Sequence, residues 1–241
     1  MFPAGGPGPL DVRVALKRVA NAAGQSVEIL SNLAFRLEAG EVGALIGPSG
    51  CGKSTCMRIV AGLDSSFDGA VERPAGPLAM VFQEPRLLPW RSVEDNIRLA
   101  APHAGEAALA ALLKPLGLAD HRKHFPGELS LGLARRVALA RAFAVRPSLL
   151  LLDEPFVSLD APLARALQGE LVSLIGQRSV TTVLVTHDVG EAIRLADRIF
   201  VLSPRPARVL GEIRVERPRV EMSAAEARSI EDRVEALRGA A

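Results

Sequence analysis

The chain has 241 residues, of which 49% are hydrophobic and 23% charged, and its formal net charge at pH 7 is +2. This length and composition are typical of one globular domain with a subdomain around a sizeable core, which excludes disorder as the main state. The balanced charge and the absence of tyrosine give no basis for a nucleic-acid surface, so we expect no nucleic-acid partner.

The cysteine count and the hydropathy pattern indicate where the protein works. Cys51 and Cys56 are too few for a disulfide framework and are wrongly spaced for a zinc site. The N-terminus lacks the basic region and apolar stretch of a signal peptide, and no apolar run approaches the roughly 20 residues of a membrane helix. We therefore expect a cytoplasmic protein with free thiols, in which Cys51 is a small packed residue rather than a redox switch.

The first part of the chain predicts a flexible leader at 1–10, which is rich in Gly and Pro, followed by an α/β core over 11–83. Alternating or continuous apolar residues predict its strands, and a periodic stretch that stops at Gly62 predicts a helix. The predicted strands lie at 11–19, 26–37, 41–46 and 78–82, and the helix lies at 53–61.

After residue 83 the residue pattern becomes mainly helical, and 84–146 is interpreted as an α-helical subdomain inserted into the core. Ser92 is a predicted N-cap, because acidic residues follow it in the first turn, where the helix dipole favours them. A helix over 131–145 is ended by Pro147.

The core resumes over 147–204, where strands alternate with helices and so predict a mainly parallel sheet with right-handed crossovers. The tail over 205–241 has capping-box spacing from Ser223 to Glu226, and we expect its helix to pack on the core. The strands are predicted at 149–152, 180–186 and 198–202, the core helices at 162–175 and 191–196, and the apolar face of the tail helix at Ile230, Val234 and Leu237.

A glycine-rich loop between a predicted strand and a predicted helix matches the pattern GxxxxGK[ST]. Glycines let the backbone N–H groups point at an anion, and the following helix adds the positive end of its dipole. We expect Lys53 to reach the terminal phosphates of ATP and Ser54 to ligate Mg²⁺. The expected ATP-binding residues are Gly47, Pro48, Ser49, Gly50, Cys51, Gly52, Lys53, Ser54 and Thr55.

Two carboxylates, Asp153 and Glu154, end the apolar run 149–152. Ligands of parallel α/β sheets bind beyond the carboxyl ends of strands, so both are placed beside the phosphate loop. Asp153 is the expected Mg²⁺ ligand, and Glu154 is the expected base for the attacking water.

Further motifs occur in a fixed order: a glutamine after the strand 78–82, the segment ELSLGLARR before the acidic pair, and VTHD after the strand 180–186. This order resembles the nucleotide-binding subunit of ATP-binding cassette (ABC) transporters over 12–204. The resemblance implies a P-loop NTPase fold with N-terminal antiparallel strands and an α-helical subdomain. It also implies roles for Gln83 (Q-loop, Mg²⁺ and water), Ser130 and Gly132 (signature), Asp160 (D-loop) and His187 (switch at the γ-phosphate).

The resemblance implies partners as well. ATP would be sandwiched between two identical subunits placed head to tail, on the inner face of the cell membrane, bound to an integral membrane permease and served by an extracytoplasmic solute-binding protein. The segment 81–91, VFQEPRLLPWR, is similar to importers of nitrate, sulfonate, taurine and related anions, with Trp90 on the surface that receives the permease.

Two departures keep a second reading open. The signature reads LSLGL, so Leu131 adds bulk where the backbone approaches the nucleotide. The position expected for an adenine-stacking aromatic falls on Ala22 or Ala23. The alternative to a transport ATPase is therefore a degenerate, non-hydrolysing ATP-binding module with a regulatory role.

Overall fold

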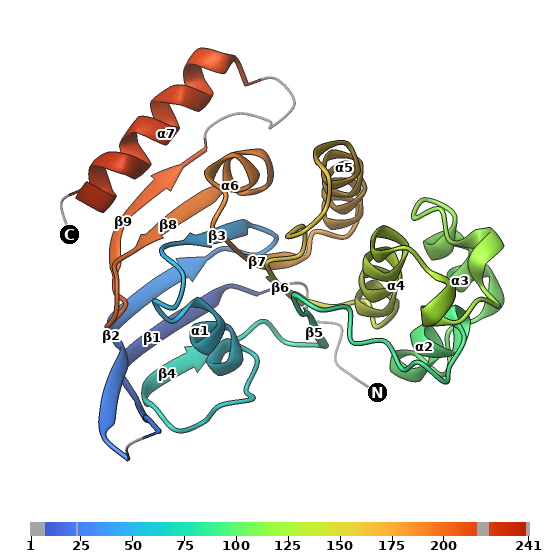
Figure 1. Ribbon diagram of the computed structural model, residues 1–241, viewed down its shortest axis with the longest axis horizontal. Coiled ribbons are helices and arrows are strands. Elements are labelled where there is room, and N and C mark those ends of the chain that lie inside the picture. Colours follow the sequence, from blue (N-terminus) through green and yellow to red (C-terminus); the bar gives the residue numbers. More distant parts are fainter. Residues whose placement is uncertain (1–7, 23, 216–221, 240–241) are drawn as a thin grey trace.

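The computed structural model describes residues 8–22, 24–215 and 222–239. Figure 1 shows two sheets beside a helical region that lies to one side of them. The strands are β1 (Leu10–Ala20), β2 (Ser26–Leu37), β3 (Val42–Ile46), β4 (Asp68–Glu72), β5 (Leu78–Val81), β6 (Leu149–Asp153), β7 (Thr181–Thr186), β8 (Arg198–Leu202) and β9 (Val209–Arg214). The helices are α1 (Lys53–Val60), α2 (Val93–Ala100), α3 (Glu106–Leu113), α4 (Leu131–Ala144), α5 (Ala161–Arg178), α6 (Val189–Leu195) and α7 (Ala224–Gly239), with short 3₁₀ turns at Ala119–His121 and Pro126–Glu128.

The larger sheet has six strands in the order β5-β6-β7-β3-β8-β9, and all neighbours except β8 and β9 are parallel. Strands β3 and β7 are buried along their whole length, as expected for strands covered by helices on both faces. The mainly parallel α/β core expected from the sequence is confirmed.

A second, antiparallel sheet in the order β2-β1-β4 packs over α1, so that helix lies between two sheets. Its core joins β1 and β2 side chains such as Leu10 and Leu33 to Met57 of α1 and to Phe200 of β8. The opposite face of the large sheet forms another core with α4, α5, α6 and α7. The predicted N-terminal antiparallel strands are therefore present, and they cover one face of the phosphate-loop helix.

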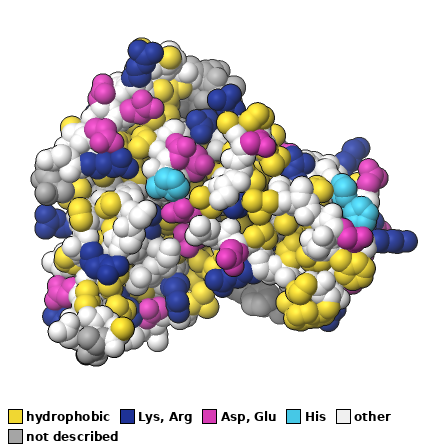
Figure 2. Space-filling model, viewed as in Figure 1, with side chains coloured by type: hydrophobic (Ala, Val, Ile, Leu, Met, Phe, Trp, Pro, Cys, Tyr) yellow, Lys and Arg dark blue, Asp and Glu magenta, His cyan; other side chains and the backbone are white. Residues whose placement is uncertain are grey.

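The helical region is anchored by caps that the sequence predicts and by one buried amide that it does not. Ser92 caps α2 by accepting from the backbone N–H of Asp95. Asn96 is fully buried, and its amide bonds the backbone at Leu88, Arg91 and Ser92. This amide fixes the turn that leads out of the core, where the Trp90 side chain is 71% exposed. On the face shown in Figure 2, hydrophobic side chains gather over α2 and α3, and charges of both signs are interspersed elsewhere.

The expected elements recur with small changes in bounds, but β4 and β9 were not predicted. Strand β9 pairs with β8 and extends the sheet into the tail, and β1 begins at Leu10, which is fully buried. The tail helix is confirmed: Ser223 and Glu226 form the reciprocal capping box, and Ile230 and Val234 are buried against the core. Residues 1–7 of the expected leader, together with Ala23, lie outside the described residues.

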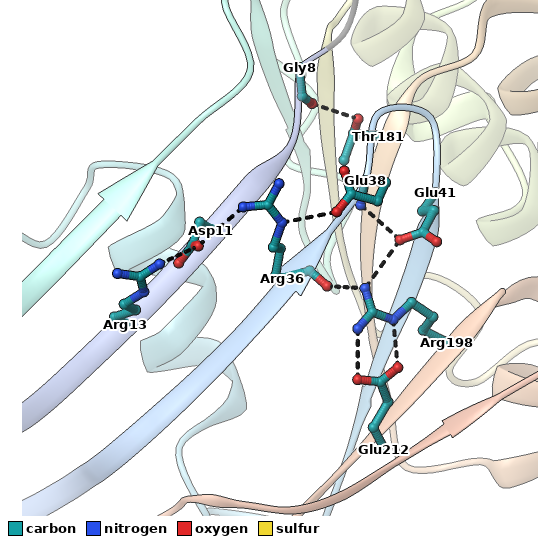
Figure 3. A network of polar contacts seen from close by, with 9 residues as sticks. All are labelled: Gly8, Asp11, Arg13, Arg36, Glu38, Glu41, Thr181, Arg198 and Glu212. Carbon is teal, nitrogen blue, oxygen red and sulfur yellow. Dashed lines mark hydrogen bonds and ion pairs between the residues drawn. The ribbon is translucent and has the colours of Figure 1, made fainter.

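Polar contacts join the two sheets at the edge where β3, β7 and β8 begin (Figure 3). Arg198 donates from Nε and Nη2 to the two carboxylate oxygens of Glu212, each at 2.7 Å, and lies 3.3 Å from Glu41. It also donates to the backbone carbonyl of Arg36 in the antiparallel sheet. The network therefore fixes the sheets together at the edge opposite the carboxyl ends of the strands.

Candidate functional site

Four loops meet at the carboxyl edge of the parallel strands. The register pairs Ile46 of β3 with Thr186 of β7, and Asp153 of β6 with Val185 of β7. Strand β5 ends beside β6, which places the exposed Gln83 beyond the same edge. The predicted phosphate loop, acidic pair, glutamine and histidine thus follow neighbouring strand ends, where parallel sheets bind ligands.

The phosphate loop, Gly47 to Ser54, curls between β3 and α1. Lys53 is only 5% exposed, and its Nζ donates to the carbonyl oxygens of Gly47 (2.8 Å) and Pro48 (3.0 Å). The ammonium group therefore closes the loop on itself. Since its partners are carbonyl oxygens of the loop itself, the ammonium group is placed to exchange them for phosphate oxygens.

Close packing makes glycine necessary at the start of α1. Gly52 has φ +131°, and a Cβ there would lie 2.7 Å from Leu30 Cδ2 and 3.2 Å from the carbonyl oxygen of Ile29. Strand β2 thus lies directly against the phosphate loop. Cys51 is 2% exposed and Gly47 packs on its sulfur, so Cys51 is a packed residue, as expected.

A hydroxyl and a carboxylate lie together at the edge of the loop. Ser54 Oγ is 3.4 Å from Asp153 Oδ1, and burial raises the pKa of the Asp153 carboxyl. Two hard oxygen donors suit Mg²⁺, which usually takes only one or two protein ligands besides water and phosphate. Among the described residues there is no group of three or more His, Cys, Asp or Glu that would form an all-protein metal cage. The donor set fits an ion shared with phosphate.

The second acid points toward the predicted histidine. Glu154 Oε2 lies 3.2 Å from His187 Nδ1, with side chains 21% and 57% exposed. Glu154 has φ +46°, an uncommon conformation for a residue with a side chain, and its N–H donates to Val185 of β7 at 2.9 Å. The Glu154 carboxylate and the His187 imidazole are thus held together, and Glu154 directly follows Asp153, which is one of the two candidate Mg²⁺ donors.

A cavity of about 410 Å³ opens beside this pair, between α5 and α6. Glu191 lines it and accepts from the buried Thr186 hydroxyl at 2.6 Å, and burial raises the pKa of the Glu191 carboxyl. The Thr186 hydroxyl also accepts from the N–H of Asp188. These contacts hold the turn that carries His187, and sequence reasoning missed them because short hydrogen bonds across a turn leave no spacing pattern.

The remaining predicted residues form a second group around Leu163. Ser130 and Asp160 are the N-caps of α4 and α5, accepting from the N–H groups of Leu133 (3.3 Å) and Leu163 (2.8 Å). Gly132 is buried, and a Cβ on it would lie 2.6 Å from Leu163 Cδ2. The expected signature and D-loop segments are therefore packed together. Leu131 is 43% exposed, and Ala22 is exposed in the β1–β2 turn.

Arg135, which sequence reasoning also missed, joins α4 to the acidic loop. It is 5% exposed, and its guanidinium donates to the carbonyl oxygens of Pro155 and Val157, each at 2.5 Å. Its signal was available, because Arg135 shares a helix face with the buried Ala138 and Leu139.

The family model described as ABC transporter matches residues 30–157. The chain is 43% identical over 207 residues to the aliphatic sulfonates import ATP-binding protein SsuB 2 of Pseudomonas syringae pv. tomato, covering 86% of this chain and 87% of that protein. It is 47% identical over 180 residues to the protein named SsuB 1 of Rhodococcus jostii, covering 73% of each.

Solved structures of ABC cassettes are also similar to this chain. The dimeric structure of a bacterial ABC transporter cassette matches with a TM-score of 0.76 at 26% identity, covering 86% of this chain and 99% of that one. A post-hydrolysis structure of that cassette, bound to ADP and Pi, matches with a TM-score of 0.75 at 27% identity and the same coverage. Within the described part of the chain, no helix is both long and apolar enough to cross a membrane.

Proposed function

Because the chain belongs to the ABC transporter family and is an ATPase cassette of that family, we propose that it is the ATP-hydrolysing subunit of an importer for small sulfonated anions. Two copies would bind ATP head to tail and drive a separate membrane permease from the inner face of the cell membrane. The observation that carries hydrolysis is the Glu154–His187 contact, 3.2 Å long, beside the Ser54–Asp153 pair.

The chemistry follows from the positions of these side chains. Lys53 and the loop N–H groups bind the phosphates, and the Glu154 carboxylate accepts a proton from the water that attacks the γ-phosphorus. The bond from that phosphorus to the leaving ADP oxygen breaks, and His187 donates a hydrogen bond to the phosphoryl group being transferred. Ser54, Asp153 and Gln83 would hold Mg²⁺, which when bound neutralises phosphate charge.

The grouping of Ser130, Gly132 and Asp160 supports a dimer. Ser130 and Asp160 are the N-caps of α4 and α5, and the positive end of a helix dipole suits closure on the phosphates of a nucleotide held by another copy. ATP binding would favour the closed pair, and hydrolysis would release it. An extracytoplasmic solute-binding protein completes the proposed system.

The substrate class rests on the names of the relatives, which are aliphatic sulfonate importers, and on the segment 81–91. Nitrate is the competing anion, and taurine, an aminoalkanesulfonate that is a zwitterion near pH 7, is the competing sulfonate. In liposomes carrying the chain with its permease and solute-binding protein, ATP hydrolysis should be stimulated by an alkanesulfonate more than by nitrate or taurine. Equal stimulation by all three would contradict the sulfonate assignment.

The test of hydrolysis compares the wild type with Glu154→Gln. Loss of the carboxylate should lower phosphate release by about 10²–10⁴-fold, the usual contribution of a general base, while ATP binding remains. Light scattering after size exclusion should then show a Glu154→Gln dimer only with Mg-ATP. If the complex with the permease binds ATP but does not hydrolyse it, the degenerate binding module replaces this proposal.

A further inference from the structure

Arg135 makes an unusual set of contacts for a buried cation. Its Nη1 donates to Pro155 O at 2.5 Å and approaches Glu154 O at 3.5 Å, while Nη2 donates to Val157 O at 2.5 Å. All three acceptors are backbone carbonyls of the loop that begins with Glu154. A guanidinium fork can hold several acceptors in one fixed arrangement, so these contacts fix the path of that loop.

The backbone of Glu154 needs such support. Its φ of +46° is held on one side by the bond from its N–H to Val185 O at 2.9 Å. On the other side, the peptide groups that follow it are held by Arg135. A non-glycine residue keeps such a conformation only where its surroundings over-determine it. Arg135 therefore supports the backbone on the side of Glu154 that leads into the loop.

The N-terminal end of the same helix bears the signature residues. Helix α4 runs from Leu131 to Ala144 with Ser130 as its N-cap, so Arg135 lies about one turn from that end. Gly132 packs against Leu163, which ties the beginning of α4 to the beginning of α5. One turn of an α-helix is stiff. A displacement of the Ser130 end would therefore also displace Arg135 and its contacts with the loop carbonyls.

We propose that Arg135 is a positioning residue for Glu154, and that it links closure of α4 on the partner's nucleotide to the catalytic loop of its own chain. This inference rests on the proposed function. In this arrangement, Ser130 and Gly132 at the beginning of α4 contact the nucleotide held by the partner. Arg135, on the same helix, orients the Glu154 base that acts on the nucleotide held by its own chain.

The test replaces Arg135 with Met, which keeps the bulk of the side chain and removes every donor. The kcat for ATP hydrolysis should fall by about ten- to a hundredfold, because general-base catalysis depends on the orientation of the base, while the ATP KM and the Kd for a fluorescent ATP analogue stay within about twofold. Arg135→Lys should restore part of kcat, because one ammonium reaches fewer of the three carbonyls.

Arg136→Met is the matched control. Arg136 is the next residue on α4, but it bonds Leu116 O at 3.2 Å and Glu170 at 2.8 Å, away from the acidic loop. Its replacement should change thermal stability without lowering kcat selectively. A parallel loss of kcat and nucleotide affinity in the two Met variants would overturn the proposal, as would an Arg135→Met variant with wild-type kcat.

A double-mutant cycle separates positioning from a general structural effect. If Arg135 acts through Glu154, adding Arg135→Met to Glu154→Gln should lower the residual rate no further. An additional tenfold loss would contradict the inference. If Arg135→Met does not fold, Arg135→Lys carries the same cycle. Wild-type turnover is measured first, since its absence with the permease present would refute the proposed function instead.

Discussion

His187 Nδ1 lies 3.2 Å from Glu154 Oε2, although the two residues stand on different loops of the sheet. Glu154 follows β6 and His187 follows the neighbouring strand β7, and the register that pairs Asp153 with Val185 brings them together. The imidazole is more than half exposed while the carboxylate is largely covered. In the proposed mechanism the histidine is therefore the member of the pair that faces the phosphate.

Replacing His187 by Ala should lower kcat by about ten- to a hundredfold, because it removes a donor to the transferred phosphoryl group and the partner that orients Glu154. Nucleotide affinity should change little, since Lys53 and the loop N–H groups remain. Phosphate release and equilibrium binding of an ATP analogue measure the two effects. His103→Ala, an exposed histidine in the helical region, is the control, and equal rates in both variants would refute this role for His187.

Gly52→Ala should damage both folding and ATP binding. Its φ of +131° strains any other residue, and the new methyl would lie 2.7 Å from Leu30 Cδ2 and 3.2 Å from Ile29 O. Gly62→Ala is the matched control, because Gly62 also has positive φ (+74°) but would meet only the Arg73 guanidinium, at ordinary distances of 3.5 Å (Nη2) and 3.8 Å (Cζ). We expect Gly52→Ala to lower the free energy of unfolding by at least about 1 kcal/mol more than the control. Chemical denaturation measures the difference, and equal losses would show that packing against β2 is unimportant.

The sequence predicted best the features that depend on residues close together in the chain. Strand–loop–helix order places Lys53, the LLLLDE run places Asp153 and Glu154, and caps such as Ser92 and Ser223 mark helix ends, because each depends on neighbours within a few residues. Strand β9 escaped prediction because it is mostly half-exposed and alternates weakly. Strand β4 is exposed along most of its length, and its place in the sheet comes only from pairing with β1.

Contacts between distant segments were beyond sequence reasoning. The bonds from Arg135 to the carbonyls after Glu154 span about twenty residues, and Arg141 likewise holds Pro85 and Arg86 from α4. Backbone carbonyls carry no residue identity, so no motif announces such a contact. The ion pair of Arg198 with Glu212 depends on β9, and could not be predicted without that strand.

The thiols should be slow to react in the native protein. Burial raises the pKa of the Cys56 thiol to about 12, with Cys51 nearby as a smaller cause, and the thiolate is the reactive form. Cys51 itself is 2% exposed. With a disulfide reagent at pH 8, we expect slow modification in buffer and fast modification of both cysteines in guanidinium. Rapid native labelling of Cys56 would contradict the burial seen here.

The Arg198–Glu212 contact should make stability depend on acidity. The hydrogen bonds from Arg198, followed by its charge, lower the pKa of Glu212 in the folded protein below the ordinary value of 4.5. A carboxyl with a lowered folded pKa stabilises the protein fully above its unfolded pKa, and this contribution is lost as pH falls through the folded pKa. The window for Glu212 therefore begins near pH 4.5 and extends below it.

Glu212→Gln should thus lower the free energy of unfolding at pH 7 by about 1–2 kcal/mol, as expected for a two-bond pair that is partly exposed and partly screened by solvent. The gap to the wild type should narrow as the pH falls from 4.5 towards 3, because protonation then removes the same charge from the wild type. Glu235→Gln is the control: its carboxylate is 65% exposed and pairs with Arg238 on the surface of α7, so its effect should be small at every pH. Denaturation curves at several pH values decide the matter. A gap for Glu212→Gln that stays constant down to pH 3 would show that the side chain stabilises the two sheets by packing and not by its charge.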